Sequence, residues 1–169
     1  MTVKMLPRLF VAVDTPDLDA AVAMTDGLKG AAGLGIKLGL EFFGAHGPAG
    51  VKAVTERVGA GTIFLDLKFH DIPNTVAGAI RAVVPLAPAV VNVHASGGPT
   101  MMRAAAAAAT EAAAKAGVAR PAVLAVTVLT SMDESDLSAV GQTGAPEEQV
   151  VRLAKLAQEC GMDGVVCSA

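Results

Sequence analysis

The sequence predicts an α/β fold, a (β/α)8 or TIM barrel, with only about six of the eight strand–helix units present in the chain. Three observations support this fold. Short β-branched runs alternate with alanine-rich helical stretches, glycine or polar residues separate them, and polar side chains follow the strands in turn. Strands that alternate with helices indicate a parallel sheet with helical crossovers. We expect a single domain over residues 1–169.

Each expected strand is a short apolar run bounded by glycine, proline or a polar residue. These runs lie at residues 9–13, 34–38, 62–68, 89–94, 121–129 and 164–167. No G-x-G-x-x-G turn follows the first run. Its absence argues against a dinucleotide-binding fold, because that turn is what brings the backbone close to a pyrophosphate.

The stretches between these runs have helix-forming compositions. We expect helices at residues 16–29, 40–58, 72–85, 98–115, 134–140 and 146–160. Asp17 opens the first helix, Pro73 is tolerated in the first turn of the third, and Pro146 with two glutamates opens the last. The second helix is expected to be interrupted at residues 47–48, a glycine followed by a proline.

Composition argues against several functional classes. The chain has 169 residues, of which 53% are hydrophobic and 17% charged, and its net charge is −3. The basic residues are scattered and Trp and Tyr are absent, so we expect neither nucleic acid nor a membrane surface as a partner. Two cysteines are too few for a disulfide framework, and no apolar run approaches the roughly eighteen residues of a membrane span. A cytoplasmic protein is the expectation.

Polar side chains mark the carboxyl ends of five successive expected strands. They are Asp14, Lys37, Asp66 with Lys68, His94 and Thr130. In a (β/α)8 barrel this face carries the active site. Two of these residues also have structural explanations: Asp14 as the cap of the helix that follows it, and His94 as a hydrogen-bonded strand end, which we favour over a catalytic role.

Residues 63–75 carry the densest group of ionisable side chains, with Asp66, Lys68, His70 and Asp71 within six positions. Asp66 and Lys68 leave the same face of a strand, about 6–7 Å apart along the backbone. A structural ion pair at the strand end is the alternative explanation, and the isolated Lys37 on the preceding strand argues against it. His70 beside Asp71 suggests a metal site, but the other histidines lack a matching spacing, and we expect no metal.

Chain length conflicts with a complete barrel. At roughly 28 residues per unit, eight units need about 225 residues, whereas the 169 residues have room for six. An open sheet of six strands leaves its first and last strands as unpaired apolar edges. We therefore expect the chain to be a fragment, or to lack its last quarter.

The stretch 66–75, Asp-Leu-Lys-Phe-His-Asp-Ile-Pro-Asn-Thr, resembles the D-x-K-x-x-D-I-x-x-T signature of the orotidine 5'-phosphate decarboxylase family. Other stretches that resemble the family are residues 11–14, 36–39, 93–95, 126–131 and 163–169. The resemblance implies cofactor-free decarboxylation of orotidine 5'-monophosphate to uridine 5'-monophosphate, in de novo pyrimidine biosynthesis. It also implies a homodimer with active sites at the interface.

The resemblance also assigns roles to individual residues. It implies that Lys68 protonates the C6 carbanion, within an alternating array of Lys37, Asp66, Lys68 and Asp71 whose last member comes from the neighbouring subunit. Asp14 and Lys37 would hold the ribose hydroxyls. The implied substrate contacts also include Asp66, Leu67, Lys68, Phe69, His70, Asp71, Ile72, Pro73, Asn74, Thr75 and Thr130.

This reaction suits a fixed ammonium group. Loss of CO2 from C6 leaves a carbanion that the ring delocalises poorly, and a nearby ammonium stabilises that charge and then donates a proton. A lysine flanked by two carboxylates stays protonated. The carboxylates would also crowd the carboxylate of the substrate, although preorganised stabilisation of the carbanion explains the same layout.

Phosphate sites in this barrel are often built after the seventh and eighth strands. The Gln and Arg that grip the 5'-phosphate in the family have no counterpart here, so we expect the 169-residue chain alone to be poorly active. Two other functions remain open. One is a Mg²⁺-dependent sugar-phosphate decarboxylase or aldolase with the same D-x-K-x-x-D pattern, and the other is an inactive truncated barrel fragment that self-associates.

Overall fold

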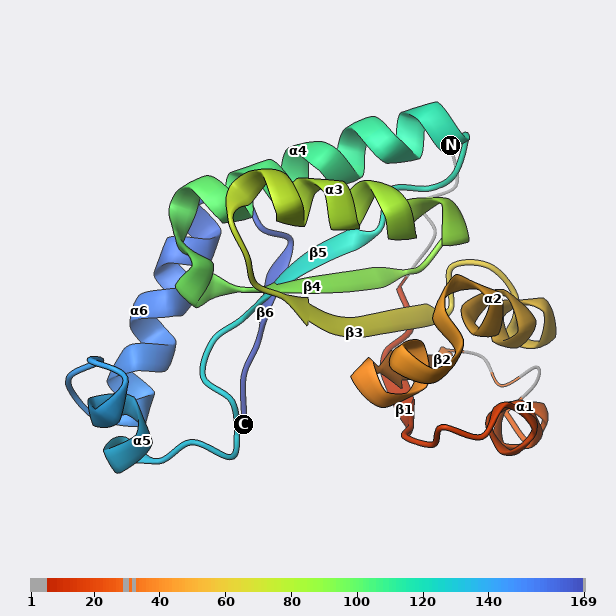
Figure 1. Ribbon diagram of the computed structural model, residues 1–169, viewed down its shortest axis with the longest axis horizontal. Coiled ribbons are helices and arrows are strands. Elements are labelled where there is room, and N and C mark those ends of the chain that lie inside the picture. The colour runs from red at the N-terminus through yellow and green to blue at the C-terminus, as the bar shows by residue number, and fades with distance from the viewer. Residues whose placement is uncertain (1–5, 29–30, 32, 169) are drawn as a thin grey trace.

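The computed structural model describes residues 6–28, 31 and 33–168. Six parallel strands form one curled sheet in the order β1-β2-β3-β4-β5-β6 (Figure 1). The strands are β1 (Leu9–Val13), β2 (Leu34–Gly39), β3 (Ile63–Phe69), β4 (Val90–His94), β5 (Ala122–Val126) and β6 (Gly164–Val166). The predicted order of parallel strands is confirmed. Within the described residues β1 and β6 each pair on one side only.

A helix follows each of the first five strands, and two follow β5. The α-helices are α1 (Leu18–Asp26), α2 (Leu40–Val58), α3 (Pro73–Val83), α4 (Gly98–Ala116), α5 (Glu134–Ala139) and α6 (Pro146–Glu159). Short 3-10 helices, η1 (Val84–Leu86) and η2 (Ala95–Gly97), precede β4 and α4. The expected end of the first helix at Lys29 lies outside the described residues. None of the helices in the described part of the chain is both long and apolar enough to cross a membrane.

The predicted interruption of the second helix is present, the first helix starts close to the expected position, and one expected strand is shorter. Helix α2 bends at Gly47, whose φ of 54° and ψ of −152° are not helical, and Pro48 follows it. Asp17 caps α1 by accepting a hydrogen bond from the amide of Ala20. Strand β5 ends at Val126, three residues before the expected end.

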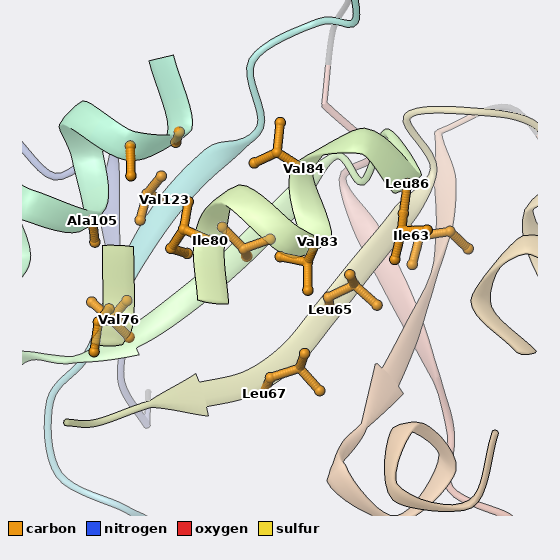
Figure 2. Packing of buried hydrophobic residues seen from close by; sticks show 14 of the residues in the cluster. Ile63, Leu65, Leu67, Val76, Ile80, Val83, Val84, Leu86, Ala105 and Val123 are labelled. Atoms are coloured by element: carbon orange, nitrogen blue, oxygen red, sulfur yellow. The ribbon is translucent and has the colours of Figure 1, made fainter. Parts of the chain in front are cut away.

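The core lies between the sheet and the helices that cover its outer face, with α3 and α4 side by side above β3, β4 and β5 (Figure 1). Figure 2 shows Ile63, Leu65 and Leu67 of β3 on the side of α3, and all three are buried. Successive side chains of a strand point to opposite faces. Burial of these three therefore turns the residues between them, Asp66 and Phe64 among them, toward the inner face of the sheet.

The inner face is tightly packed near the amino ends of the strands. Phe10 and Phe64 meet edge to face there, with ring centroids 5.6 Å apart. A Cβ at Gly35 would lie 2.6 Å from the ring of Phe10 and 2.6 Å from the carbonyl oxygen of Thr62. Only glycine fits between β1 and β3 at this point. The aromatic pair lies toward the amino ends of the strands, and the polar residues lie at their carboxyl ends.

Candidate active site

A chain of four charged side chains lies at the carboxyl ends of β1, β2 and β3. The Nζ of Lys68 is 2.8 Å from Oδ1 of Asp66, and the Nζ of Lys37 is 3.2 Å from Oδ2 of the same carboxylate. The Nζ of Lys37 also lies 3.8 Å from Oδ1 of Asp14. The order of charges is therefore Asp, Lys, Asp, Lys across three neighbouring strands, and the structure brings together four residues that the sequence selected.

Asp66 is the buried centre of this array, with 11% of its side chain exposed, against 25% for Lys37 and 28% for Lys68. Burial acts to raise the pKa of the Asp66 carboxyl. Hydrogen bonds from Lys68, Asn92 and Lys37, together with the charge of Lys68, outweigh burial and lower the pKa below its usual value. Asp66 thus stays ionised at neutral pH and holds both ammonium groups in fixed positions.

Asp14 is free to join this array because it does not cap a helix. Its carboxylate is exposed, whereas the cap of α1 is Asp17, three positions later. The helix-cap explanation for Asp14 is therefore wrong. A cap must lie directly before the first turn of its helix, and α1 begins only at Leu18.

A buried asparagine ties the array to the next strand. Asn92 of β4 is 0% exposed, and its Nδ2 donates a hydrogen bond of 2.6 Å to Oδ1 of Asp66. Its own Oδ1 accepts a 2.8 Å hydrogen bond from the backbone amide of Lys68. Lys68 has a φ of 48°, in the left-handed region, which costs a residue with a side chain about 1–3 kcal/mol. The surrounding contacts hold a strained backbone at the residue predicted to be the proton donor.

The second part of the predicted motif is mostly exposed. The carboxylate of Asp71 is exposed and accepts a 2.6 Å hydrogen bond from the amide of Ile72, and no ion pair joins it to the described residues. Ile72 is 67% exposed. The next three predicted contacts, Pro73, Asn74 and Thr75, form the first turn of α3. Within the described chain no ion pair or side-chain hydrogen bond joins these five residues to the array.

Two other members of the predicted contact segment face the protein interior. Leu67 is 4% exposed and lies in the core beneath α3 (Figure 2), so only its backbone can reach a substrate. Phe69 is half-buried and packs against the same core. These residues anchor the end of β3, and the polar residues on either side of them depend on that anchor.

Two histidines lie side by side beyond the array. The rings of His70 and His94 have centroids 5.3 Å apart, and both line a cavity of about 390 Å³ that also contains Gln142. Burial, then the nearby charges of His70 and Lys68, lower the pKa of His94, while Asp66 opposes the shift.

Thr130 is exposed and lines a neighbouring cavity, after β5. The structure does not bring Thr130 into contact with the array.

Among the residues that the structure describes, no three His, Cys, Asp or Glu side chains gather closely enough to hold a metal ion. The array is instead built from carboxylates that are each engaged by a lysine.

Comparison with known proteins identifies the family of the chain. A sequence model described as the orotidine 5'-phosphate decarboxylase / HUMPS family matches residues 7–169. The chain belongs to this family. It is 57% identical over 161 residues to an orotidine 5'-phosphate decarboxylase of Rhodospirillum rubrum, with 95% of the chain and 64% of that protein covered. It is 54% identical over 162 residues to the protein of the same name from Moorella thermoacetica, with 95% of the chain and 63% of that protein covered.

Solved structures extend the family likeness to the fold. The crystal structure of orotidine 5'-phosphate decarboxylase from Lactobacillus acidophilus matches with a TM-score of 0.86 and 35% identity, covering 97% of this chain and 72% of that one. An uncharacterized conserved protein from Geobacillus kaustophilus matches with a TM-score of 0.85 and 40% identity, covering 94% and 73%. The fold is therefore that of this barrel family, with six of the eight strand–helix units in this chain. The chain spans less than two thirds of the length of the first relative, 64%.

Sequence reasoning missed Asn92. The strand segment Val-Val-Asn-Val-His contains a single amide between apolar neighbours. A buried polar side chain requires hydrogen-bond partners. This requirement is the signal that could have linked Asn92 to the charged residues on the adjacent strand.

Proposed function

We propose that this site decarboxylates orotidine 5'-monophosphate to uridine 5'-monophosphate, as a cytoplasmic step of pyrimidine biosynthesis. The observation that carries the proposal is the fixed Lys68 ammonium, 2.8 Å from the buried Asp66 carboxylate at the carboxyl edge of the sheet. The name of the Rhodospirillum rubrum relative, at 57% identity, supports the same substrate.

In the proposed reaction the bond between C6 and the carboxylate carbon breaks, CO2 leaves, and the electron pair stays on C6. The Nζ of Lys68 then donates a proton to C6, and solvent returns a proton to the amine. Asp66 and Lys37 fix the ammonium before the substrate arrives, so little reorganisation is needed when negative charge develops on C6. The reaction needs no cofactor, because the developing charge is met by an ammonium that can also supply the proton.

The substrate ribose would lie beside Asp14 and Lys37, at the carboxyl ends of β1 and β2. The Nζ of Lys37 reaches the carboxylates of both Asp14 and Asp66, so Lys37 and Asp14 present a donor and an acceptor side by side. Each hydroxyl of a vicinal diol can both donate and accept, so such a pair can bind it. We assign the two ribose hydroxyls to Asp14 and Lys37 on this basis.

We infer that the active site is completed in a homodimer. Asp71 and Ile72 are exposed, although they lie only a few residues after Lys68. Two copies related by a twofold axis would each present the tip formed by Asp71 and Ile72 to the other, since such interfaces are self-complementary. Asp71 would then complete the Lys-Asp-Lys-Asp order in the partner's site.

The proposal is tested with two proteins, the 169-residue chain and a chimera. The chimera carries, after the chain, the part of the Rhodospirillum rubrum relative that follows its matched region. We expect the chain alone to release little CO2 from orotidine 5'-monophosphate, because remote phosphate contacts lower the barrier at the reacting carbon. The chimera is expected to release CO2 and uridine 5'-monophosphate at a rate comparable to that of the relative.

The outcomes separate the alternatives. A folded, dimeric chimera that does not release CO2 would overturn the proposal and favour an inactive fragment. Activity on a sugar phosphate that EDTA abolishes and Mg²⁺ restores would favour the related metal-dependent enzyme. Activity on orotidine 5'-monophosphate that survives EDTA supports the proposal.

A further inference from the structure

Strands β3 and β4 pair out of step beside the array. Phe64 pairs with Val90 and Leu65 with Val91, but the next pair joins Phe69 to Val93. Three residues of β3 therefore stand opposite a single residue of β4, Asn92. The usual backbone ladder is interrupted where β3 carries Asp66 and Lys68.

The side chain of Asn92 replaces the missing ladder contact. Its Oδ1 accepts the amide hydrogen of Lys68 at 2.8 Å, where a strand carbonyl would otherwise do so. Its Nδ2 donates to Oδ1 of Asp66 at 2.6 Å. One planar amide therefore fixes two things at once: the backbone from which the Lys68 side chain departs, and the orientation of the carboxylate that holds its ammonium.

The bond from Nδ2 of Asn92 reaches the same carboxylate oxygen as the Lys68 ion pair. Oδ1 of Asp66 receives both Nδ2 of Asn92 and Nζ of Lys68, whereas Oδ2 receives Lys37. If the asparagine amide is removed, only the two flexible lysines still hold the carboxylate, so we expect the Asp66 carboxylate and the Lys68 ammonium to shift together. The left-handed backbone at Lys68, with a φ of 48°, also loses the hydrogen bond that holds its amide.

We propose that Asn92 is a positioning residue: it holds the Asp66 carboxylate and the Lys68 backbone in the register break, and so sets where the proton-donating ammonium lies. The inference rests on the proposed decarboxylation for its effect on catalysis, but not for its effect on Asp66. Asn92 is fully buried and its side chain bonds Asp66 and the Lys68 amide, so we expect it to act through these two neighbours.

The first measurement uses the 169-residue chain itself and does not depend on activity. The Asp66 carboxyl is titrated by ¹³C NMR in the wild-type chain, in Asn92→Leu, which removes both hydrogen bonds while keeping apolar bulk, and in Asn92→Asp. The aspartate variant keeps an acceptor for the Lys68 amide but places a second carboxylate beside Asp66. We expect the pKa of Asp66 to rise in Asn92→Leu, because Asp66 loses a hydrogen-bond donor. In Asn92→Asp two neighbouring carboxyls titrate together, and we expect their higher apparent pKa to lie above that of Asp66 in the leucine variant.

A matched control removes a buried hydrogen bond elsewhere. Thr25 of α1 is 0% exposed and its hydroxyl donates to the carbonyl of Val22 at 2.7 Å. Thr25→Val should lower the stability of the fold while the titration of Asp66 stays as in the wild-type chain. This variant separates loss of a buried bond in general from loss of the bond to Asp66.

The second measurement uses whichever of the chain and the chimera turns over orotidine 5'-monophosphate. Misplacement of a catalytic group by about 1 Å can cost about 10²-fold, so we expect kcat to fall about 10- to 100-fold in Asn92→Leu while KM changes little. A structural role alone would lower thermal stability and leave kcat unchanged.

Unchanged Asp66 titration in both variants, or unchanged kcat with only a loss of stability, would overturn the positioning role. If one variant does not fold, the other decides. If no protein decarboxylates the nucleotide, the proposed function fails, and the NMR titration still shows whether Asn92 holds Asp66.

Discussion

The two ends of one short motif behave in opposite ways. Asp66 and Lys68 point to the inner face of the sheet, where Lys37 and Asn92 complete their contacts within the chain. A few residues later, the carboxylate of Asp71 is exposed and bonds only the amide that follows it, among the described residues.

The difference comes from the structure that each end belongs to. The first end lies on β3, where burial of Leu65 and Leu67 under α3 leaves its polar neighbours no direction but inward. The second end lies in the turn before α3, where Asp71 and Ile72 are exposed. Part of the motif is therefore satisfied by its own chain, and part is available to another molecule.

The largest expected effect on activity concerns the inward end of the motif, Asp66 and Lys68. Lys68→Ala removes both the cation and the proton donor at the reacting carbon. In the protein form that turns over substrate, we expect kcat for decarboxylation to fall by at least about 10³-fold. Lys52→Ala, which removes an exposed lysine of α2, is the control and should leave the rate unchanged. A Lys68→Ala variant with near-normal kcat would contradict the assigned role.

The outward end is tested by mixing two inactive variants. Asp71→Asn and Lys68→Ala should each be nearly inactive alone. If Asp71 serves the partner's site, a mixed dimer contains one site with both native residues, and an equal mixture should regain about one quarter of the native activity. The measurement is CO2 release after the two proteins are mixed and allowed to exchange subunits. No recovery, despite subunit exchange seen by mass spectrometry, would mean that Asp71 acts within its own chain.

The sequence was sufficient to predict the sheet and most of the inward end. Alternation of apolar runs with helical stretches predicts six parallel strands in order, and the strand ends predict Asp14, Lys37, Asp66 and Lys68 as neighbours. This works because parallel strands bring their carboxyl ends to one edge, whatever the details of packing.

Regular spacing could not predict how closely the charges approach. Two residues of an ideal strand place Asp66 and Lys68 about 6–7 Å apart along the backbone, whereas their charged atoms are 2.8 Å apart. The long side chain of Lys68 spans that separation. What regular spacing could not predict is the break in the pairing of β3 with β4, the positive φ of Lys68 and the hydrogen bonds of Asn92 to both residues, because local sequence carries no periodic signal for them.

An intermediate effect is expected on stability, and it depends on pH. The pKa of Asp66 is lower in the folded protein than in the unfolded chain, because its hydrogen bonds to Lys68, Asn92 and Lys37 outweigh burial. Its contribution to the free energy of unfolding is therefore complete above the ordinary aspartate pKa, and it is lost as the pH falls through the lower folded value.

Asp66→Asn should lower the free energy of unfolding at neutral pH by about 1–3 kcal/mol, the usual value of hydrogen bonds to a charged group. The difference from the wild-type chain should shrink as the solution is acidified toward the folded pKa. Urea unfolding at several pH values measures both quantities. Asp26→Asn, at an exposed position of α1, is the control and should change stability by less than about 0.5 kcal/mol at any of them. A constant deficit for Asp66→Asn across the acid range would contradict the assignment.

The smallest effect on stability is expected at the tip of the outward end. Ile72 is 67% exposed, so Ile72→Ser removes almost no apolar contact from the folded chain and should change the free energy of unfolding of the monomer by less than about 0.5 kcal/mol. If the tip packs into a second copy, the same change should weaken the dimer, because an exposed aliphatic side chain that becomes buried contributes about 1.5–3 kcal/mol.

Analytical ultracentrifugation over a dilution series measures the dimer dissociation constant. Val151→Ser removes an apolar side chain of α6 that is 53% exposed, and it should leave that constant unchanged. Equal dissociation constants for Ile72→Ser and the wild-type protein would place the interface elsewhere, and Asp71 would then need another explanation for its outward position.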